Sequence, residues 1–245
     1  MSRIAIIAAL EREILPLVRG WKRSLLASSV DALPFYENGD VIAVAGGIGC
    51  QRAERAALAA TDRFHPETLV SAGLSGALIR SLKAGNVVLP SVVVDAENGA
   101  EYRCDPMENV VTGGVLVSTA EVADANSKTK LVEKFHGLVV DMEAAGVARA
   151  ARTRGTRFCC VKAISDEFDF RMPPLTRFID DHGNVQEAKF ALWTAARPHY
   201  WLPAMRLAGN SRRAIQAMTE WLQKNVPCKS AAVPVVTLER ADHTN

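Results

Sequence analysis

The sequence lacks a strong excess of charge of either sign. Its 29 Lys and Arg residues nearly balance its 27 Asp and Glu residues, and the formal net charge is +2. A balance this even does not favour nucleic acid or an anionic membrane as the main partner. The hydrophobic content of 49% and the charged content of 23% are typical of a soluble globular protein.

Cysteine is scarce and irregularly placed. The five cysteines are an odd number without regular spacing, which predicts neither a disulfide framework nor a zinc site. Cys159 and Cys160 lie inside an apolar run, where buried, reduced thiols are the simplest interpretation. We expect no metal ion and no other cofactor.

No apolar run near the N-terminus is long. The run at residues 4–10 is followed at once by Glu11, Arg12 and Glu13. It is too short for a signal peptide or a membrane span. The sequence therefore predicts a cytoplasmic protein without an integral membrane segment.

The chain also lacks internal repeats, low-complexity tracts and linkers. We expect one domain at residues 1–226 and a loose surface tail at residues 227–245. Strands and helices alternate, with a more strand-rich middle. This pattern predicts an α/β fold of three layers, in which helices flank a central mixed, partly barrel-like sheet.

Apolar runs bounded by turns predict the strands, and helix-forming or periodic segments predict the helices. A turn at residues 37–40 joins two of the strands as an antiparallel pair. Strands are expected at residues 4–9, 28–36, 40–45, 68–72, 110–118, 138–140 and 158–164, and helices from Leu10 and at residues 51–64, 142–152 and 205–224. Residues 95–109 are polar and irregular.

Two carboxylates follow the ends of two neighbouring strands. Glu143 comes soon after the strand at 138–140, and Asp166 comes soon after the strand at 158–164. Ligands of open α/β sheets bind outside the carboxyl ends of the strands. We therefore expect the two side chains to lie close together at one edge of the sheet.

The stretch that contains these carboxylates, LVVDMEAAGVARAARTRGTRFCCVKAISDEFDF, resembles the nucleoside phosphorylase and nucleosidase superfamily. Its motifs are nearest to those of the methylthioadenosine/S-adenosylhomocysteine nucleosidases, and the resemblance covers about residues 3–170. In that family a Met-Glu pair grips the ribose hydroxyls and a Ser-Asp pair addresses the purine. The matching pairs here are Met142-Glu143 and Ser165-Asp166.

Three further positions take an expected role from the resemblance. Glu13, within ALEREI, stands where the family has the glutamate that activates the attacking water; the alternative is a surface acid that stabilises a helix start. The turn from Gly73 lies beneath the ribose, with Leu74 at the family's hydroxyl position and Ser75 one residue later. Val122 provides an apolar wall where the family commonly has a purine-stacking aromatic residue. Residues 82–94 stand where the family has a turn and a long strand.

The resemblance implies cleavage of a purine N-glycosidic bond through an oxocarbenium-like sugar. Asp166 would protonate the leaving base, helped by a pKa that burial can raise, and Ser165 would orient it. Glu143 would accept hydrogen bonds from the ribose hydroxyls, with Met142 packed against the sugar. Glu13 would take a proton from water.

The nucleophile leaves alternatives open. Arg12, Arg52 and Arg80 do not form a recognisable phosphate-binding set, and Glu13 would repel phosphate, so hydrolysis is preferred over phosphorolysis. The glycine-rich turn at 45–49 is either a phosphate cradle or a tight turn. A non-catalytic nucleoside-binding protein is the third alternative. Lys162 is expected to hold Glu143 by charge.

The expected partners are a small purine nucleoside, phosphate in the phosphorolysis alternative, and further copies of the chain in a homo-oligomer, a dimer first. The aromatic-rich segment 170–203 is expected to shape the 5′ side of the site and to favour a large apolar 5′ group. Its alternative role is an extra helix and loop or a subunit interface. The aromatic residues that carry this expectation are Phe170, Phe178, Trp193, Tyr200 and Trp201.

Overall fold

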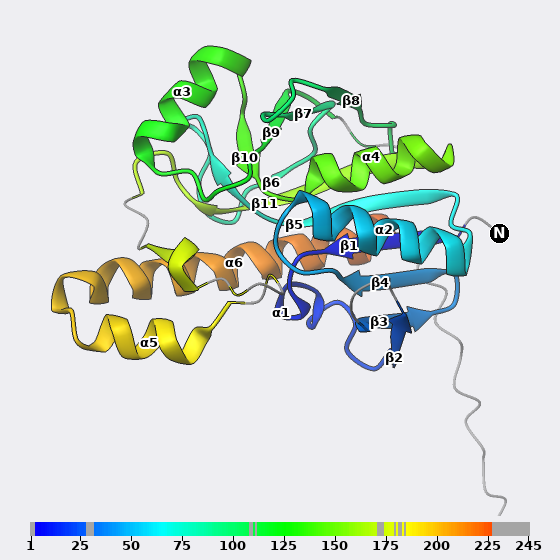
Figure 1. The fold of residues 1–245 in the computed structure, drawn as a ribbon, viewed down its shortest axis with the longest axis horizontal. Helices are drawn as coiled ribbons and strands as arrows, with labels where there is room; N and C mark the ends of the chain where they lie inside the picture. Colours follow the sequence, from blue (N-terminus) through cyan, green and yellow to red (C-terminus); the bar gives the residue numbers. More distant parts are fainter. Residues whose placement is uncertain are drawn as a thin grey trace, which may run out of the picture.

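A computed structural model describes residues 3–27, 32–107, 110, 112–170, 174–178, 180, 183 and 185–226. Among these residues, eleven strands form one mixed sheet with helices on both of its faces (Figure 1). The predicted α/β fold, a central mixed sheet flanked by helices, is confirmed. The predicted tail at 227–245 lies outside the described residues.

The strands are short except for the two that form the middle of the sheet. They are β1 (Ile4–Ala8), β2 (Lys22–Ala27), β3 (Ala32–Asn38), β4 (Val41–Ala45), β5 (Thr68–Ala77), β6 (Val87–Val88), β7 (Val92–Asp95), β8 (Glu101–Arg103), β9 (Val115–Ser118), β10 (Val139–Asp141) and β11 (Arg157–Asp166). The α-helices are α1 (Glu11–Ile14), α2 (Cys50–Phe64), α3 (Ala125–Phe135), α4 (Ala144–Arg154), α5 (Glu187–Ala195) and α6 (Trp201–Asn225), and the 3-10 helices are η1 (Leu175–Phe178) and η2 (Pro198–Tyr200).

Strand β5 is the branch point of the sheet. It pairs in parallel with β1 on one side and with β11 on the other, and its last residues also pair with β10. The main path runs β2-β3-β4-β1-β5-β10-β9-β7-β8, with β11 and β6 off this path. Strand β10 runs antiparallel to β5. The ends of β10 and β11 converge because β10 pairs with Gly76 and Ala77 at the end of β5, and Asp166 at the end of β11 also pairs with Gly76.

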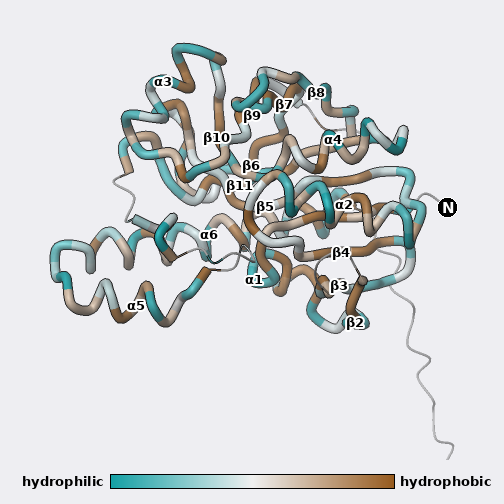
Figure 2. Tube along the Cα trace, viewed as in Figure 1, coloured by the Kyte–Doolittle hydropathy of each residue, from teal (hydrophilic) through white to brown (hydrophobic). Residues whose placement is uncertain are grey.

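The two largest apolar cores lie on the two faces of the sheet, and a smaller one lies beneath α3. Successive residues of β1 point to opposite faces: Ala5 and Ile7 pack toward α2 and α4, and Ile6 and Ala8 pack toward α1 and α6. Figure 2 shows the apolar character of the central strands along the trace. Burial on both faces explains why these strands are continuously apolar rather than alternating.

The crossing of α2 and α4 positions one wall of the site. A Cβ at Gly146 would lie 2.0 Å from the carbonyl oxygen of Cys50, so only glycine permits the two helix starts to approach this closely. Helix α4 ends at Gly155 with φ 64°, the left-handed conformation that commonly terminates helices. The close crossing brings Glu143, the residue before α4, against Gly49, the residue before α2.

Several element boundaries differ from the predictions. The expected turn at 73–78 is the continuation of β5 to Ala77, because both edges of this segment have strand partners. The expected long strand within 82–94 is divided into β6 and β7, with Pro90, which cannot donate a ladder hydrogen bond, between them. The strand expected at 110–118 begins at Val115, after two glycines.

Two strands lie outside the predicted set, and two predicted elements differ in length. Strand β2 pairs with β3, and β8 pairs with β7 within the segment expected to be irregular. The helix expected from Leu10 is only the four residues of α1, whereas α6 begins at Trp201, four residues earlier than predicted. The first part of the strand expected at 28–36 lies outside the described residues. Among the described helices, none has both the length and the apolar character needed to cross a membrane.

Candidate active site

A cavity of about 500 Å³ opens where β1, β5, β10 and β11 end. The loop after β9 and the inner side of α6 complete its walls. Seven of the eight predicted site residues line it: Glu13, Ser75, Val122, Met142, Glu143, Ser165 and Asp166. Leu74, which stands at the family's hydroxyl position, also lines it.

Gly73, the eighth predicted residue, lies behind the wall. A Cβ at this position would be 3.1 Å from Glu13 Oε2 and 3.7 Å from Lys162 Nζ. Gly73 is not among the lining residues, so the structure places it against the side chains of the site rather than on the cavity surface. Gly76 takes the place on the cavity wall that was expected for Gly73.

A β-bulge brings Ser165 and Asp166 to the same cavity. Ile164 pairs with Ser75, and Asp166 pairs with Gly76, so Ser165 is the extra residue of β11. A regular strand would direct neighbouring side chains to opposite faces, whereas a bulge re-aims them. The single O–H proton of Ser165 has two acceptors within reach, Asp166 Oδ1 at 2.9 Å and the Ser75 carbonyl at 3.3 Å from Oγ.

Asp166 has a second partner that the sequence did not predict. Lys128 Nζ, from α3, lies 2.5 Å from Asp166 Oδ2, and both side chains are buried. The signal was present in the sequence, because Lys128 shares one helix face with Leu131, Val132 and Phe135, which pack into an apolar core. A lysine on the apolar face of a helix requires a buried partner.

Lys162 forms an ion pair with Asp141 and also acts by charge on Glu143, the partner expected from the sequence. Its Nζ lies 2.8 Å from Asp141 Oδ2, and both side chains are inaccessible to solvent. Burial alone would lower the pKa of Lys162, but the charges of Asp141 and Glu143 outweigh it, so the pKa is raised above its ordinary value. Ser118 Oγ donates to Asp141 at 2.6 Å and completes this fixed pair.

Glu143 is held by two backbone amides. Its Oε1 accepts a hydrogen bond from Gly49 N at 3.0 Å, and its Oε2 accepts one from Met142 N at 3.3 Å. Removal from water and the nearby charge of Asp141 raise the pKa of Glu143 to about 8, although Lys162 acts in the opposite direction. The Gly49 amide, which begins α2, therefore binds a carboxylate of the protein itself.

Glu13 is buried beside the same lysine. Burial raises the pKa of Glu13, and the charge of Lys162 opposes the shift. Among the described residues, none donates a hydrogen bond to Glu13 Oε2. This oxygen is buried, and it faces Gly73. One lysine thus lies near three carboxylates, those of Glu13, Asp141 and Glu143, and burial raises the pKa of Glu13 and Glu143 against the effect of its charge.

The opposite wall of the cavity is largely apolar and comes from α6 and the segment before it. Its members are Val185, Phe190, Ala204, Leu207, Ala208 and Ile215, with Arg12 and Arg212 also on the cavity surface. The five aromatic residues named for the 5′ side are absent from the described lining. Three of them pack in a cluster with Phe190: the ring centroids of Phe178 and Phe190 are 5.4 Å apart, those of Phe178 and Trp193 are 5.6 Å apart, and those of Trp193 and Tyr200 are 4.8 Å apart.

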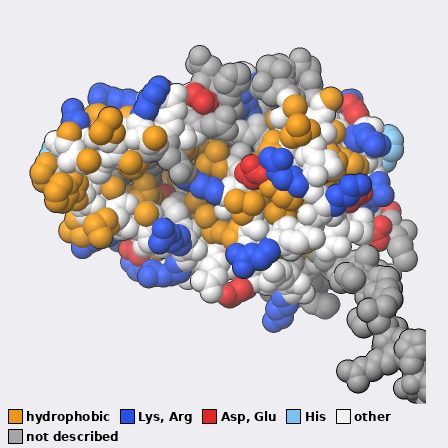
Figure 3. All heavy atoms as spheres, turned by 90° about the horizontal axis from the view of Figure 1, so that it is seen from below, with side chains coloured by type: hydrophobic (Ala, Val, Ile, Leu, Met, Phe, Trp, Pro, Cys, Tyr) orange, Lys and Arg blue, Asp and Glu red, His pale blue; other side chains and the backbone are white. Residues whose placement is uncertain are grey.

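Helices α5 and α6 also present apolar side chains to solvent. Leu192 and Met205 are 76% and 72% exposed, and Trp201 and Leu202 lie between them in the sequence with more than half of their surface exposed. Figure 3 shows apolar side chains gathered at the end of the molecule where these two helices lie.

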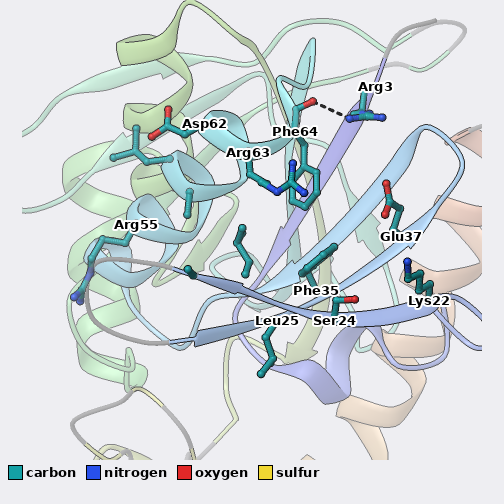
Figure 4. Close-up of a pocket in the computed structure, with 14 residues that line it drawn as sticks. Arg3, Lys22, Ser24, Leu25, Phe35, Glu37, Arg55, Asp62, Arg63 and Phe64 are labelled. Atoms are coloured by element: carbon teal, nitrogen blue, oxygen red, sulfur yellow. Dashed lines mark hydrogen bonds between the residues drawn. The ribbon is translucent and has the colours of Figure 1, made fainter.

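A second, larger hollow of about 1030 Å³ lies between the β2–β3 hairpin and α2 (Figure 4). Phe35 and Phe64 pack together on its floor with ring centroids 5.0 Å apart, and Arg3 donates a hydrogen bond to the Phe64 carbonyl. None of the predicted site residues lines this hollow. Among the described residues, no group of three or more His, Cys, Asp or Glu side chains could hold a metal ion.

Fold and cavity together define an α/β protein with a carboxylate-lined ligand site at the ends of its strands. The family model of the phosphorylase superfamily matches residues 3–112 and 106–195. The chain belongs to this superfamily, as its Met-Glu and Ser-Asp motifs predicted.

Particular relatives share this assignment. The 5′-methylthioadenosine/S-adenosylhomocysteine nucleosidase of Bacillus licheniformis is 27% identical over 197 residues, covering 67% of this chain and 85% of the relative. The nucleosidase of the same name from Bacillus subtilis is 28% identical with the same coverage. The similarity thus extends over most of each relative's length.

Solved structures show the same fold. The Helicobacter pylori 5′-methylthioadenosine/S-adenosylhomocysteine nucleosidase with butyl-thio-DADMe-Immucillin-A has a TM-score of 0.68 and 17% identity, covering 92% of this chain and 98% of that one. The futalosine hydrolase of Helicobacter pylori has a TM-score of 0.67 and 18% identity, covering 92% and 97%.

Proposed function

We propose that this protein is a nucleosidase that hydrolyses the N-glycosidic bond of an adenine-type purine nucleoside and releases the base. The observation that carries the proposal is that Glu13, Glu143 and Asp166 line one cavity. Their partners differ: Glu143 accepts from backbone amides, Asp166 contacts Lys128, and Glu13 Oε2 has no hydrogen-bond partner among the described residues. Glycosidic cleavage needs an acid for the leaving group, a stabiliser for the cationic sugar and a base for the nucleophile. Relatives named as methylthioadenosine/S-adenosylhomocysteine nucleosidases support this assignment.

Asp166 acts at the base end of the cavity. It delivers a proton to the imidazole ring of the purine as the glycosidic bond breaks, so the base leaves as a neutral molecule. The Ser165 hydroxyl fixes the orientation of the carboxyl group through the 2.9 Å hydrogen bond. Val122, on the loop before α3, forms an apolar wall for the purine.

Glu143 acts at the sugar. Its carboxylate accepts hydrogen bonds from the ribose hydroxyls, and Met142 packs against the ring. Burial and the charge of Asp141 favour the neutral form of Glu143, because they raise its pKa to about 8. A positive charge that develops on the sugar favours the ionised form, so the attraction is strongest when the bond is breaking, as electrostatic catalysis requires.

Glu13 acts on the nucleophile. Its raised pKa brings the carboxylate closer to the range in which a base is effective near neutral pH. The Oε2 atom, which accepts no hydrogen bond from the described residues, takes a proton from the attacking water. Ser75, whose carbonyl is held by Ser165, lies on the same wall.

The surroundings of the glycine-rich turn favour water over phosphate. The Gly49 amide, the group at the start of α2 that would bind a phosphate, is occupied by Glu143. A phosphate in this place would also meet the negative charge of Glu13 whenever that group is ionised. Arg12 and Arg212 on the cavity surface are the feature that supports phosphorolysis as the second candidate.

The apolar wall from α5 and α6 supports a nucleoside with an apolar 5′ group. Phe190 and Leu207 lie on the wall opposite the carboxylates, where such a group is removed from water. Our prediction that segment 170–203 shapes this side is therefore retained for Phe190 rather than for the five aromatic residues first named. The exposed Leu192, Leu202 and Met205 support a homo-oligomer formed by the outer surface of the same helices. We retain a single domain at 1–226 and a cytoplasmic location as parts of the proposal.

Release of adenine from a panel of adenosine derivatives tests the function. The panel contains adenosine, 5′-methylthioadenosine and a derivative with a longer 5′-alkylthio chain, each assayed with and without phosphate. We expect release without phosphate, with the highest kcat/KM for an apolar 5′ group. Binding without any release would favour a non-catalytic nucleoside-binding protein.

A further inference from the structure

The outer side of the α5–α6 pair is apolar and open to solvent. Its exposed side chains are Leu192 of α5 and Trp201, Leu202 and Met205 at the start of α6, which we call the apolar tip. The two helices extend beyond the sheet at one end of the molecule (Figure 1), and apolar side chains gather there in Figure 3. Of the six exposed large apolar side chains among the described residues, four belong to this tip. The exposure is therefore concentrated in one place, as at an interaction surface.

The segment that carries the apolar tip contains cations and no anions. Residues 188–219 include five Lys and Arg residues and no Asp or Glu, although the whole chain has 29 of the former and 27 of the latter. The small net charge of the chain therefore conceals one strongly basic segment. Its basic residues are Lys189, Arg197, Arg206, Arg212 and Arg213.

Helix geometry places two of these cations beside the apolar tip. Lys189 and Leu192 are three positions apart on α5, and Leu202 and Arg206 are four positions apart on α6, so each pair shares one side of its helix. Both cations are exposed, and neither forms an ion pair among the described residues. Each helix thus presents an exposed apolar side chain with an unneutralised cation one turn away.

This combination matches the chemistry of an anionic membrane surface. Apolar side chains, Trp in particular, enter the boundary between headgroups and acyl chains, while Lys and Arg pair with the phosphates above it. We propose that the outer side of α5 and α6 binds the surface of an anionic phospholipid bilayer. The apolar tip then enters the bilayer boundary, and Lys189 and Arg206 lie at the level of the phosphates.

The proposed homo-oligomer would cover the same side chains, so a bilayer and a second copy compete for them. A symmetric pair of copies places the same patch on both sides of the contact, which brings the cations of the two copies together. Anionic lipids neutralise these cations instead. We therefore expect anionic vesicles to displace the second copy from this surface.

Attachment through the apolar tip leaves the candidate active site open. Ala204, Leu207 and Ala208 line the cavity, whereas Leu202 and Met205, on the same turns of α6, do not. The two sides of these turns therefore face different surroundings. Membrane binding is independent of the proposed reaction, and its test needs no turnover.

The test is co-sedimentation of the full chain with two kinds of vesicle: phosphatidylcholine alone, and phosphatidylcholine mixed with phosphatidylglycerol. We expect the wild type to bind the mixed vesicles, and to bind less in high salt or without phosphatidylglycerol. The triple variant Leu192→Gln/Leu202→Gln/Met205→Gln and the double variant Lys189→Gln/Arg206→Gln should each bind at least about 10-fold more weakly.

The controls remove the same kinds of side chain elsewhere. Leu25→Gln replaces a leucine of β2 that is 61% exposed, and Lys130→Gln replaces an exposed lysine of α3. Both should bind the mixed vesicles as the wild type does. Cross-linking between copies of the wild type should fall when these vesicles are added.

Three results would overturn the proposal. A wild type that binds neither kind of vesicle, together with a triple variant that no longer self-associates, would make the apolar tip a subunit interface only. Equal binding by the wild type and both multiple variants would mean that another surface contacts the lipid. If the triple variant does not fold, the double variant and salt still decide, because binding that neither of them weakens would contradict the role of the cations.

Discussion

Replacement of Gly76 by alanine is expected to disable the site through one added methyl group. A Cβ at this position would lie 2.7 Å from Asp166 Oδ2 and 3.2 Å from Val140 Cγ1. Ordinary carbon contacts begin near 3.4 Å, so the carboxylate must move by about 0.7 Å. Misplacement of a catalytic group by about 1 Å lowers rates by about 100-fold, and we expect kcat/KM for adenine release to fall about 10- to 100-fold.

The same methyl group is expected to lower stability. Overpacking of a core costs about 1–3 kcal/mol, and for a chain of this size each kcal/mol shifts Tm by about 2–4 °C. The assay combines thermal unfolding with the rate of adenine release. Gly113→Ala is the matched control, because a Cβ at Gly113 meets no atom within 4 Å. A Gly76→Ala variant with the activity of Gly113→Ala would refute the placement of Asp166 at the reacting base.

Three further substitutions test separate parts of the account. Asp166→Asn should unfold as cooperatively as the wild type, but its turnover, measured as adenine release, should fall about 100- to 10,000-fold. A variant that keeps half of the wild-type activity would remove Asp166 from the mechanism. In the folded protein the pKa of Glu143 is about 8, compared with an ordinary value of 4.5. The wild type's free energy of unfolding should therefore fall relative to that of Glu143→Gln as the pH rises from 4.5 to about 8. A difference in unfolding free energy that stays constant from about pH 5 to 9, measured by urea denaturation, would contradict the buried, charge-crowded environment of Glu143. Gly146→Ala should lower Tm by several degrees, because its Cβ would meet the Cys50 carbonyl at 2.0 Å, whereas Gly209→Ala, which meets nothing within 4 Å, should not lower it.

Local motifs explain how much of the site the sequence could predict. Met142-Glu143 and Ser165-Asp166 each lie within a few residues of a strand end, so a short stretch of sequence determines both identity and placement. The strand positions also followed from continuous burial on two faces, as for β1 and β11. The extension of β5 was missed because it depends on partners on both edges, which are distant in the chain.

Contacts between distant elements account for the rest. Lys128 and Asp166 are 38 residues apart and meet only because α3 packs beside the end of β11. Lys162 of β11 forms its ion pair with Asp141, the last residue of β10, which lies two residues before Glu143 in the chain. Gly73 was expected to contact the ligand because the resemblance indicates where the backbone runs. It does not indicate that the side chains of Glu13 and Lys162 lie against this glycine.

The single-turnover rate of adenine release in phosphate-free buffer, compared between the wild type and Glu13→Gln, tests the central claim most directly. The control is Glu11→Gln, which alters a neighbouring acid that pairs with Arg23. The account predicts release of adenine and free sugar by the wild type and by Glu11→Gln, and a rate at least about 100-fold lower for Glu13→Gln. Release that requires added phosphate and yields a sugar 1-phosphate, or a Glu13→Gln variant as fast as the wild type, would contradict it.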